Sequence, residues 1–415
     1  MKPSHDIASG RLDAATIADQ FCDLHPRLTD LQAQAESARC LFCHDAPCIE
    51  ACPTEIDIPQ FIRKIQSGNT TGAAVDILRQ NIMGATCANA CPVEELCEQQ
   101  CVRNTAEDKP VTIGRLQRYA TDHLLEKGMQ PFTRAANSGL KVAVVGAGPA
   151  GLACAHRLSM HGHQVDVFEA KPKAGGLNEY GLAAYKMVDE RAAKEVDFIL
   201  ELGGIEIHYE QQLGRDISLE KLRQDYAAVF LGLGHNAVNR LGLDGEDVAG
   251  VINAVDYIER IRQEALSAIP VGRRVVVIGA GNTAIDIAVQ MKKLGAEQVT
   301  MVYRRGPEQM GATWYEQELA QTNGVIIECW AQPAAVISDA GGVTAMRFQR
   351  TKLNDEGRLE SLDEHFEVPA DMVFKAIGQH FDSALFSNDA GAEGLEFDGR
   401  RIAVDALGAT AVPGV

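Results

Sequence analysis

The sequence has little positive charge, no long apolar run and no apolar leader. Its 415 residues contain 39 Lys and Arg against 57 Asp and Glu, a formal net charge of −18. This balance argues against a general nucleic-acid-binding protein, whose contact surface is positive. No apolar run reaches the roughly 20 residues that a membrane span requires. Residues 1–30 are polar and lack the apolar centre of a secretory signal. We therefore expect a cytoplasmic protein that binds neither nucleic acid nor membrane.

Cysteine, by contrast, is abundant and clustered. Eight of the eleven cysteines lie between residues 40 and 101, in a C-x2-C-x4-C-x3-C-P run and a C-x3-C-P-x4-C-x3-C run. The first run contains Cys40, Cys43, Cys48 and Cys52, and the second contains Cys87, Cys91, Cys97 and Cys101. Thiolates at these spacings can converge on an inorganic cluster, and a cysteine before proline often ligates the other cluster of a pair. The pattern predicts two iron–sulfur clusters, most simply [4Fe-4S].

Zinc and disulfides are the alternative interpretations of these cysteines. Four-cysteine zinc sites also use closely spaced pairs, although the two Cys-Pro steps and the lack of a paired knuckle spacing favour iron–sulfur ligation. Disulfides are disfavoured, because thiols stay reduced in a protein without a secretory signal.

Helical patterns surround the cysteines. Apolar residues before Cys40 are spaced for one helix face, namely Ile17, Phe21, Leu24, Leu28 and Leu31. Residues 58–83 predict a pair of helices broken at Gly68-Asn69, and another helix begins at Ile113. Residues 128–139 have the composition of a linker. We therefore expect a first, helical domain over residues 1–135 that holds both clusters.

The segment after the linker carries a dinucleotide-binding motif. An apolar strand over residues 141–145 runs into Gly146-Ala147-Gly148-Pro149-Ala150-Gly151, and the next strand ends in Glu169. The glycines permit a tight turn and a close backbone approach, the helix N-terminus faces the pyrophosphate, and the carboxylate accepts the ribose hydroxyls. With its flanking strands the pattern predicts a bound dinucleotide.

A second motif of this kind begins at residue 279. It reads Gly279-Ala280-Gly281-Asn282-Thr283-Ala284 after the strand at residues 274–278. The following strand ends in Arg304-Arg305 rather than in an acid, and a guanidinium can pair with a 2′-phosphate that an acid would repel. This favours NADP(H), although the arginines could also be solvated loop charges.

Residues 371–378 resemble the apolar, glycine-ended strand at residues 227–234. This similarity predicts that the chain returns to the first nucleotide domain after the second one. We expect an α+β multidomain protein, in which the helical double iron–sulfur domain precedes two nested Rossmann-like α/β nucleotide-binding domains. The first would comprise residues 136–255 and 372–415, and the second residues 256–371. Residues 411–415 look like the start of a strand, so we expect an incomplete C-terminus.

This order of modules resembles the glutamate synthase small-subunit family, and most closely its FAD/iron–sulfur subunits of bacterial dihydropyrimidine dehydrogenase. The resemblance covers nearly everything from residue 35 onward. The residues that carry it are Cys40-Leu41-Phe42-Cys43-His44-Asp45-Ala46-Pro47-Cys48, Cys52-Pro53-Thr54 with Asp57-Ile58, Cys91-Pro92 with Leu96-Cys97, and Pro110 to Tyr119.

The resemblance implies a ligand for every cofactor. One cluster would use Cys40, Cys43, Cys48 and Cys101, and the other Cys52, Cys91, Cys97 and Gln117. Cys87 would then be free, whereas spacing alone makes Cys87 the eighth ligand. The first motif would hold FAD, with Gly176, Leu177 and Lys186 closing over it. The second motif would hold NAD(P)H. NADP-binding relatives often carry a further basic residue after the arginine pair, but this chain has Met310-Gly311-Ala312 there. NADH therefore remains possible.

The resemblance also implies an activity. The chain would be an NAD(P)-dependent flavin/iron–sulfur oxidoreductase, the electron-input subunit of a dihydropyrimidine dehydrogenase. Hydride would pass from NAD(P)H to FAD, and single electrons through the clusters to an FMN/iron–sulfur large subunit that reduces uracil or thymine. The alternatives are a glutamate synthase small subunit and a non-catalytic electron-transfer module. Against the glutamate synthase subunit stand Gln117 and the insert Asp45-Ala46-Pro47.

Overall fold

The computed structural model describes residues 7–415, which form two compact units whose segments alternate along the chain. The cysteine-rich unit consists of residues 23–179, 186–236 and 381–415, and the second unit consists of the described residues up to 22, 180–185 and 237–380. Within the described part of the chain, no helix combines the length and the apolar character needed to cross a bilayer.

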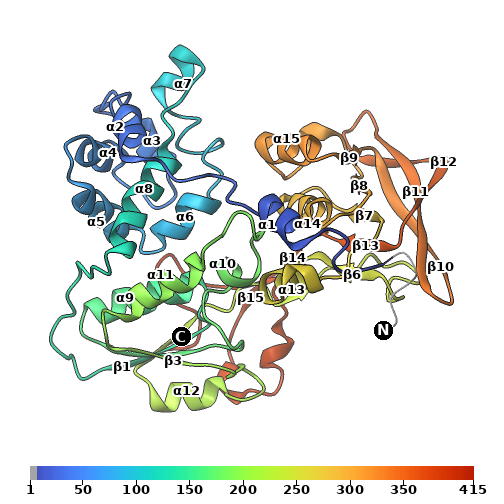
Figure 1. Ribbon diagram of the computed structural model, residues 1–415. Helices are drawn as coiled ribbons and strands as arrows, with labels where there is room; N and C mark the ends of the chain where they lie inside the picture. Colours follow the sequence, from blue (N-terminus) through green and yellow to red (C-terminus); the bar gives the residue numbers. More distant parts are fainter. Residues whose placement is uncertain (1–6) are drawn as a thin grey trace. The chain divides into compact units, whose positions relative to one another are not determined.

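Seven helices form the cysteine-bearing part of the cysteine-rich unit, and Figure 1 shows their arrangement. They are α2 (Asp30–Ser37), α3 (Pro47–Glu50), α4 (Ile58–Gln66), α5 (Thr70–Gln80), α6 (Gly84–Ala90), α7 (Val102–Glu107) and α8 (Ile113–Glu126). The side chain of Asp57 caps α4, and that of Asn69 caps α5 by accepting from the N–H of Gly72. The predicted helix pair around Gly68 is therefore confirmed.

The predicted continuous helix face from Ile17 to Leu31 is wrong. The chain forms α1 (Ala14–Gln20) and α2 as separate helices, each with its own N-cap, at Asp13 and Thr29. Leu31 is 80% exposed, whereas Ile17 is buried in the second unit. Pro26 explains the break, because it has no N–H to donate to a preceding turn.

A four-stranded parallel sheet completes the cysteine-rich unit, in the order β3-β2-β1-β4. Its strands are β1 (Lys141–Val145), β2 (Gln164–Phe168), β3 (Ile205–His208) and β4 (Ala228–Leu231). Its helices are α9 (Pro149–Met160), α10 (Leu177–Tyr180), α11 (Arg191–Leu200) and α12 (Leu219–Asp225). Figure 1 shows α9 and α11 on one side of the sheet and α12 on the other.

The sheet and the cysteine-bearing helices share one hydrophobic core. Buried residues of α4 and α5, such as Phe61 and Leu78, belong to the same packed cluster as Val144 of β1 and Leu152 of α9. The end of the chain also belongs to this unit, through η3 (Ser383–Phe386), η4 (Ala390–Ala392), β15 (Phe397–Asp398) and β16 (Arg401–Ile402). The N–H of Val229 on β4 donates to Gly414 O at 2.8 Å.

The second unit contains a five-stranded parallel sheet in the order β6-β13-β7-β8-β9 and a separate three-stranded antiparallel sheet. The parallel strands are β6 (Val251–Asn253), β7 (Arg274–Ile278), β8 (Gln298–Val302), β9 (Val325–Glu328) and β13 (Met372–Lys375). The antiparallel strands are β10 (Ala331–Asp339), β11 (Gly342–Leu353) and β12 (Leu359–Pro369). The remaining elements are α13 (Ala254–Gln263), η1 (Leu266–Ala268), α14 (Asn282–Lys293), η2 (Pro307–Gln309), α15 (Trp314–Thr322), and the paired β5 (Ala237–Val238) and β14 (Gln379–His380).

Strand β13 corrects the prediction that the chain re-enters the first sheet at residue 372. β13 pairs in parallel with β6 and β7, so residues 372–375 belong to the second nucleotide sheet. The return to the cysteine-rich unit occurs at Phe381. A short apolar strand followed by glycine is typical of either parallel sheet, so the pattern does not identify the sheet to which the strand belongs.

Candidate functional site

Four cysteines from both sequence runs line one cavity in the cysteine-rich unit: Cys40, Cys43, Cys48 and Cys101. Phe42 and Ala46, in the loop between these thiols, have positive φ angles of 53° and 29°. Non-glycine residues hold this backbone geometry only where the surroundings require it. The loop therefore folds so that distant thiols share one concave site, as the predicted first cluster requires.

Burial raises the pKa of two of these thiols, Cys40 and Cys48. Burial, together with the neighbouring Cys40 and Cys101 thiols, raises the pKa of Cys48 to about 12. Burial likewise raises the pKa of Cys40. A thiol of such high pKa is deprotonated at neutral pH only if a strong cation stabilises the thiolate. The set of donors therefore fits a metal cluster, which supplies that cation.

A second group of thiols gathers around the end of α6. The pKa of Cys91 is raised by its hydrogen bond with Cys87 and by burial, with Cys97 and Cys52 close by. The pKa of Cys97 is raised by burial, with Cys52 among its charged neighbours. None of the eleven cysteines forms a disulfide. These thiols therefore fit the predicted second cluster.

Gln117 and Cys87 lie together at this second site. Gln117 is buried on α8, its Nε2 donates to Gly84 O at 2.8 Å, and its side chain also hydrogen-bonds to Cys87. Cys87 thus contacts both Cys91 and Gln117, so the two candidates for the eighth ligand are neighbours. The choice of Gln117 over Cys87 stays a prediction.

The first glycine motif forms the tight turn expected between β1 and α9. Gly146 has a φ of +102°, and a Cβ there would lie 2.4 Å from Gly232 O. A Cβ on Gly151 would lie 1.9 Å from Gly146 O, and one on Gly176 would lie 2.7 Å from Gly148 Cα. Only glycine satisfies these approaches. Gly176, at the predicted flavin loop, therefore packs directly on the turn.

Glu169 directly follows β2 beside this turn, with its carboxylate buried. Its Oε2 accepts from the N–H of Ala147 at 2.8 Å, and its Oε1 accepts from the N–H of Lys171 at 2.8 Å. This is the position from which an acid accepts the ribose hydroxyls of a dinucleotide. Leu177, which begins α10, is 60% exposed, whereas Lys186 is buried.

The second motif has the same turn between β7 and α14. A Cβ on Gly279 would lie 2.2 Å from Ala376 O, but one on Gly281 would meet no atom within 4 Å. Asn282 and Thr283 begin α14, and Ala284 is buried where a third glycine would pack. The open space at Gly281 leaves room for a phosphate at the helix N-terminus.

The arginine pair follows β8 at the same edge of the sheet. Arg304 is exposed and Arg305 is partly buried, and neither guanidinium forms an ion pair or hydrogen bond within residues 7–415. Glu328, the acid at the end of the neighbouring strand β9, pairs instead with Arg350. Two unengaged guanidinium groups are therefore available for a phosphate.

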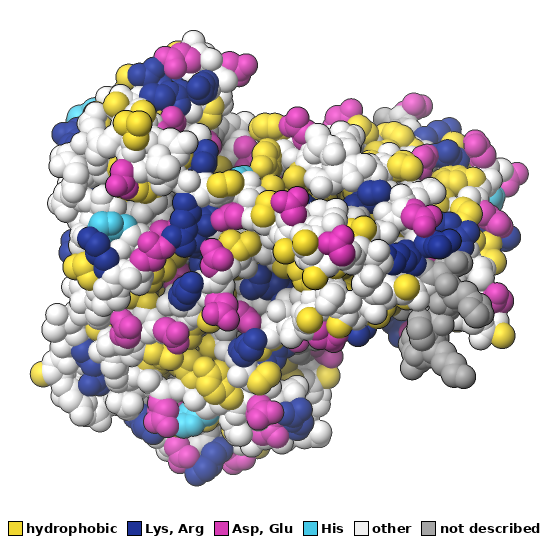
Figure 2. Space-filling model, viewed as in Figure 1, with side chains coloured by type: hydrophobic (Ala, Val, Ile, Leu, Met, Phe, Trp, Pro, Cys, Tyr) yellow, Lys and Arg dark blue, Asp and Glu magenta, His cyan; other side chains and the backbone are white. Residues whose placement is uncertain are grey.

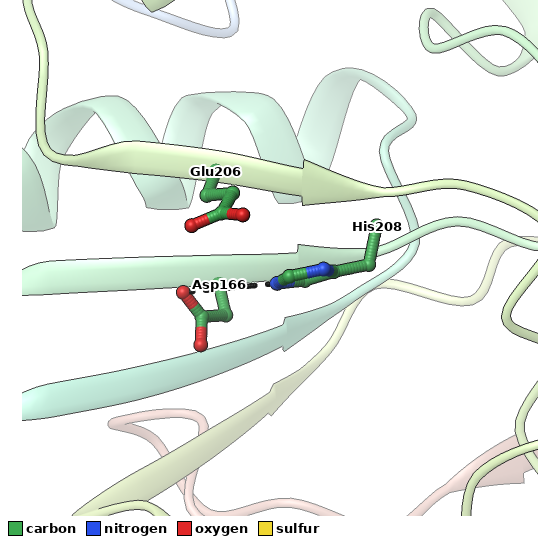
Figure 3. A group of neighbouring side chains, drawn as sticks. All are labelled: Asp166, Glu206 and His208. Carbon is green, nitrogen blue, oxygen red and sulfur yellow. Dashed lines mark ion pairs between the residues drawn. The ribbon is translucent and has the colours of Figure 1, made fainter.

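A further group of polar side chains lies on β2 and β3 (Figure 3). Asp166, Glu206 and His208 place their ligand atoms within 4.8 Å of one another. The Asp166 carboxylate, however, already binds Lys141 Nζ at 2.5 Å and the Tyr226 hydroxyl at 2.6 Å. An ammonium in this position competes with any divalent cation, so we interpret the group as an ion-pair network.

Sequence reasoning missed a buried polar group beside the second cysteine site. Glu195 on α11, Thr86 on α6 and Asn178 on α10 are joined by hydrogen bonds. A signal was present, because Glu195 occupies the apolar face of its helix, three residues after Ala192 and four before Ile199.

Comparison with known proteins identifies two families along the chain. The family described as dihydropyrimidine dehydrogenase domain II, 4Fe-4S cluster, matches residues 17–129, and the pyridine nucleotide-disulphide oxidoreductase family matches residues 140–415. The NAD-dependent dihydropyrimidine dehydrogenase subunit PreT of Salmonella typhimurium is 36% identical over 358 residues, 86% of this chain and 82% of that protein. The glutamate synthase [NADPH] small chain of Escherichia coli is 34% identical over 378 residues, 86% of this chain and 79% of that protein.

A solved structure supports the fold. FprA of Mycobacterium tuberculosis, in complex with NADPH, superposes with a TM-score of 0.51 at 22% identity, over 62% of this chain and 73% of that one. The predicted fold class, with an iron–sulfur domain before pyridine-nucleotide oxidoreductase domains, is confirmed. So are the predicted cofactors, namely [4Fe-4S] clusters, FAD and NAD(P). The chain belongs to the family of flavin and iron–sulfur oxidoreductase subunits that includes PreT and the glutamate synthase small chain.

Proposed function

We propose that this chain is the NAD(P)H-oxidising electron-input subunit of a dihydropyrimidine dehydrogenase, paired with an FMN/iron–sulfur large subunit that reduces uracil or thymine. When bound, the cofactors accept a hydride from the nicotinamide and release its electrons singly to the partner. The observation that carries the proposal is the shared core of the cysteine-rich unit, which joins both cysteine sites to the first dinucleotide turn.

The chain's own residues bind and orient the cofactors. In the proposal, the turn at Gly146 and Gly148 admits the pyrophosphate of FAD at the N-terminus of α9, and Glu169 accepts its ribose hydroxyls. Gly281 admits the pyrophosphate of the nicotinamide nucleotide in the second unit, and Arg304 and Arg305 pair with a 2′-phosphate where one is present.

No acid–base residue is assigned to the reaction. Hydride and electron transfer need no protein side chain to exchange a proton, so the protein contributes position, exclusion of water and the electrostatic field around each cofactor.

The surface beside the first cysteine site supports a protein partner. The cavity lined by the four thiols is bordered by Leu41 and Val102, which are 54% and 40% exposed, and by Arg103. Exposed apolar side chains next to a redox centre are typical of a docking surface. Nucleic acid is not a partner in this proposal, because acidic and basic side chains are interspersed on the face shown in Figure 2.

A cytoplasmic location is part of the proposal. None of the eleven cysteines, all of which lie in the described part of the chain, forms a disulfide, and a reducing compartment keeps cysteines in this state.

Reconstitution separates the proposed partner from its alternative, a glutamate synthase large subunit. The oxygen-free chain alone should oxidise NADH or NADPH with ferricyanide and leave uracil unreduced. Addition of the dihydropyrimidine dehydrogenase large subunit should start uracil reduction. Cys97→Ala should abolish uracil reduction in the complex, whereas Cys22→Ala, at an exposed thiol outside both sites, should preserve it. Uracil reduction by the chain alone would contradict this division of roles.

A further inference from the structure

A wholly buried carboxylate contacts the first turn of α6. Glu195, 0% exposed on α11, accepts hydrogen bonds from the N–H of Ala85 at 2.8 Å and from the N–H of Thr86 at 3.2 Å. The Thr86 hydroxyl donates to Oε2 of the same carboxylate at 2.6 Å. Since α6 ends at Ala90, directly before Cys91, this contact fixes the helix that carries the second cysteine site.

The Thr86 hydroxyl also accepts a hydrogen bond from α10, the helix that follows the predicted flavin loop. Asn178 Nδ2 donates to Thr86 Oγ1 at 3.0 Å. Asn178 lies two residues after Gly176, which packs against Gly148 in the first dinucleotide turn. One hydroxyl thus joins the turn assigned to FAD, the helix of the second cluster and the buried acid of α11.

Other contacts leave α6 little freedom. Gly84, its first residue, receives the hydrogen bond from Gln117, and a Cβ on Gly84 would lie 2.6 Å from Ile77 Cγ2. Burial raises the pKa of Glu195 to about 7. A buried acid is costly unless its hydrogen bonds are complete, and a neutral side chain could cap α6 at a lower cost. The carboxylate therefore points to a need for a rigid bridge at this place.

We propose that Thr86 is a positioning residue for the second cluster, because its hydroxyl, held between Asn178 and Glu195, sets the position of Cys87 and Cys91 relative to the flavin-binding turn. This inference rests on the cofactor assignment of the proposed function. It assigns a role to a side chain that ligates no cofactor itself. Residues that orient ligands from outside the coordination shell influence metal sites by about 10- to 100-fold.

The test compares two substitutions of one residue in the cofactor-loaded chain. Thr86→Val keeps the shape and removes the hydroxyl, whereas Thr86→Ser keeps the hydroxyl. Asp197→Asn is the matched control, since Asp197 is an exposed acid on the same helix as Glu195. Iron and flavin content, the EPR spectrum and midpoint potential of each cluster, and stopped-flow absorbance after addition of NADH or NADPH are recorded for each variant.

We expect Thr86→Val to retain flavin, iron and its rate of flavin reduction, while the second cluster shows an altered EPR spectrum and is reduced about 10- to 100-fold more slowly. Thr86→Ser and Asp197→Asn should match the parent chain. A Thr86→Val chain with the parent spectrum and rate would overturn the proposal. Loss of flavin and both clusters together would also overturn it, since the role would then be general stability.

Two further outcomes are distinguished from the results above: a Thr86→Val chain that does not fold, and a parent chain that binds no cofactor. If Thr86→Val does not fold, Asn178→Ala takes its place, because it removes the flavin-side donor to the Thr86 hydroxyl. An altered EPR spectrum and slower reduction of the second cluster, with flavin retained, would support the proposal, and the parent spectrum and rate would overturn it. If the parent chain itself binds neither flavin nor iron, the proposed function fails, and the failure is visible before any variant is compared.

Discussion

Replacing Asp122 by Asn should weaken the contact between the cysteine-bearing helices and α11. Asp122, 5% exposed on α8, accepts from Arg191 Nη2 at 3.2 Å and pairs with Arg27 Nε at 3.0 Å and Arg118 Nε at 3.4 Å. Arg118 and Arg191 are themselves 2% and 3% exposed. The substitution keeps the shape but removes the negative charge that these three guanidinium groups share, although Arg118 also pairs with Asp23 and Arg27 with Glu126. Breaking a buried ion pair in this way costs about 3–5 kcal/mol.

The assay is thermal unfolding of the cofactor-loaded chain without oxygen, followed by circular dichroism. For a unit of this size, 1 kcal/mol shifts the midpoint by about 2–4 °C, so Asp122→Asn should lower it by about 10 °C. Asp197→Asn, the exposed acid on α11, removes the same charge and should change the midpoint by less than about 2 °C. Equal midpoints for the two variants would refute the view that buried charges hold these helices together.

Three further predictions concern the cofactor sites and pH. Cys87→Ala should leave both clusters intact by iron content and EPR, whereas Gln117→Ala should disturb the second cluster; loss of a cluster in Cys87→Ala would instead make that thiol the eighth ligand. Replacing Arg304 and Arg305 together by Ala should raise the KM for NADPH by at least about 10-fold and leave that for NADH unchanged, because only NADPH carries the 2′-phosphate; equal effects would assign the pair to another role. Burial lowers the pKa of His156 to about 4. Between pH 6.5 and 4 the unfolded chain therefore takes up a proton that the folded chain does not, and stability falls by about 3 kcal/mol. His156→Gln should lose correspondingly less stability over this range in urea titrations, and parallel curves for the two proteins would contradict the argument.

The parts predictable from sequence are those where chemistry is encoded in a short local pattern. The cysteine runs indicate thiols that must converge, and the structure brings Cys101 of the second run to Cys40 of the first. The turn at Gly146 could be predicted because only glycine tolerates its backbone geometry and close contacts. The helices on either side of Gly68 could be predicted from their apolar spacing and capping residues.

The parts that sequence reasoning did not predict depend on packing between distant segments. Strand β13 joins the second sheet because of its neighbours β6 and β7, which its own apolar run does not specify. Leu31 fits a helical apolar face but lies on a separate helix that leaves it exposed. The position of Glu195 against Thr86 joins residues more than a hundred positions apart, so only the folded chain reveals it.

The most direct test of the account is the visible spectrum of the anaerobically purified chain, before and after NADH or NADPH, with iron, zinc and flavin analysis of the same sample. We expect flavin and iron–sulfur absorbance together, two [4Fe-4S] clusters per chain, and bleaching of both chromophores by a nicotinamide nucleotide. A colourless protein after reconstitution, or zinc in place of iron, would contradict the account.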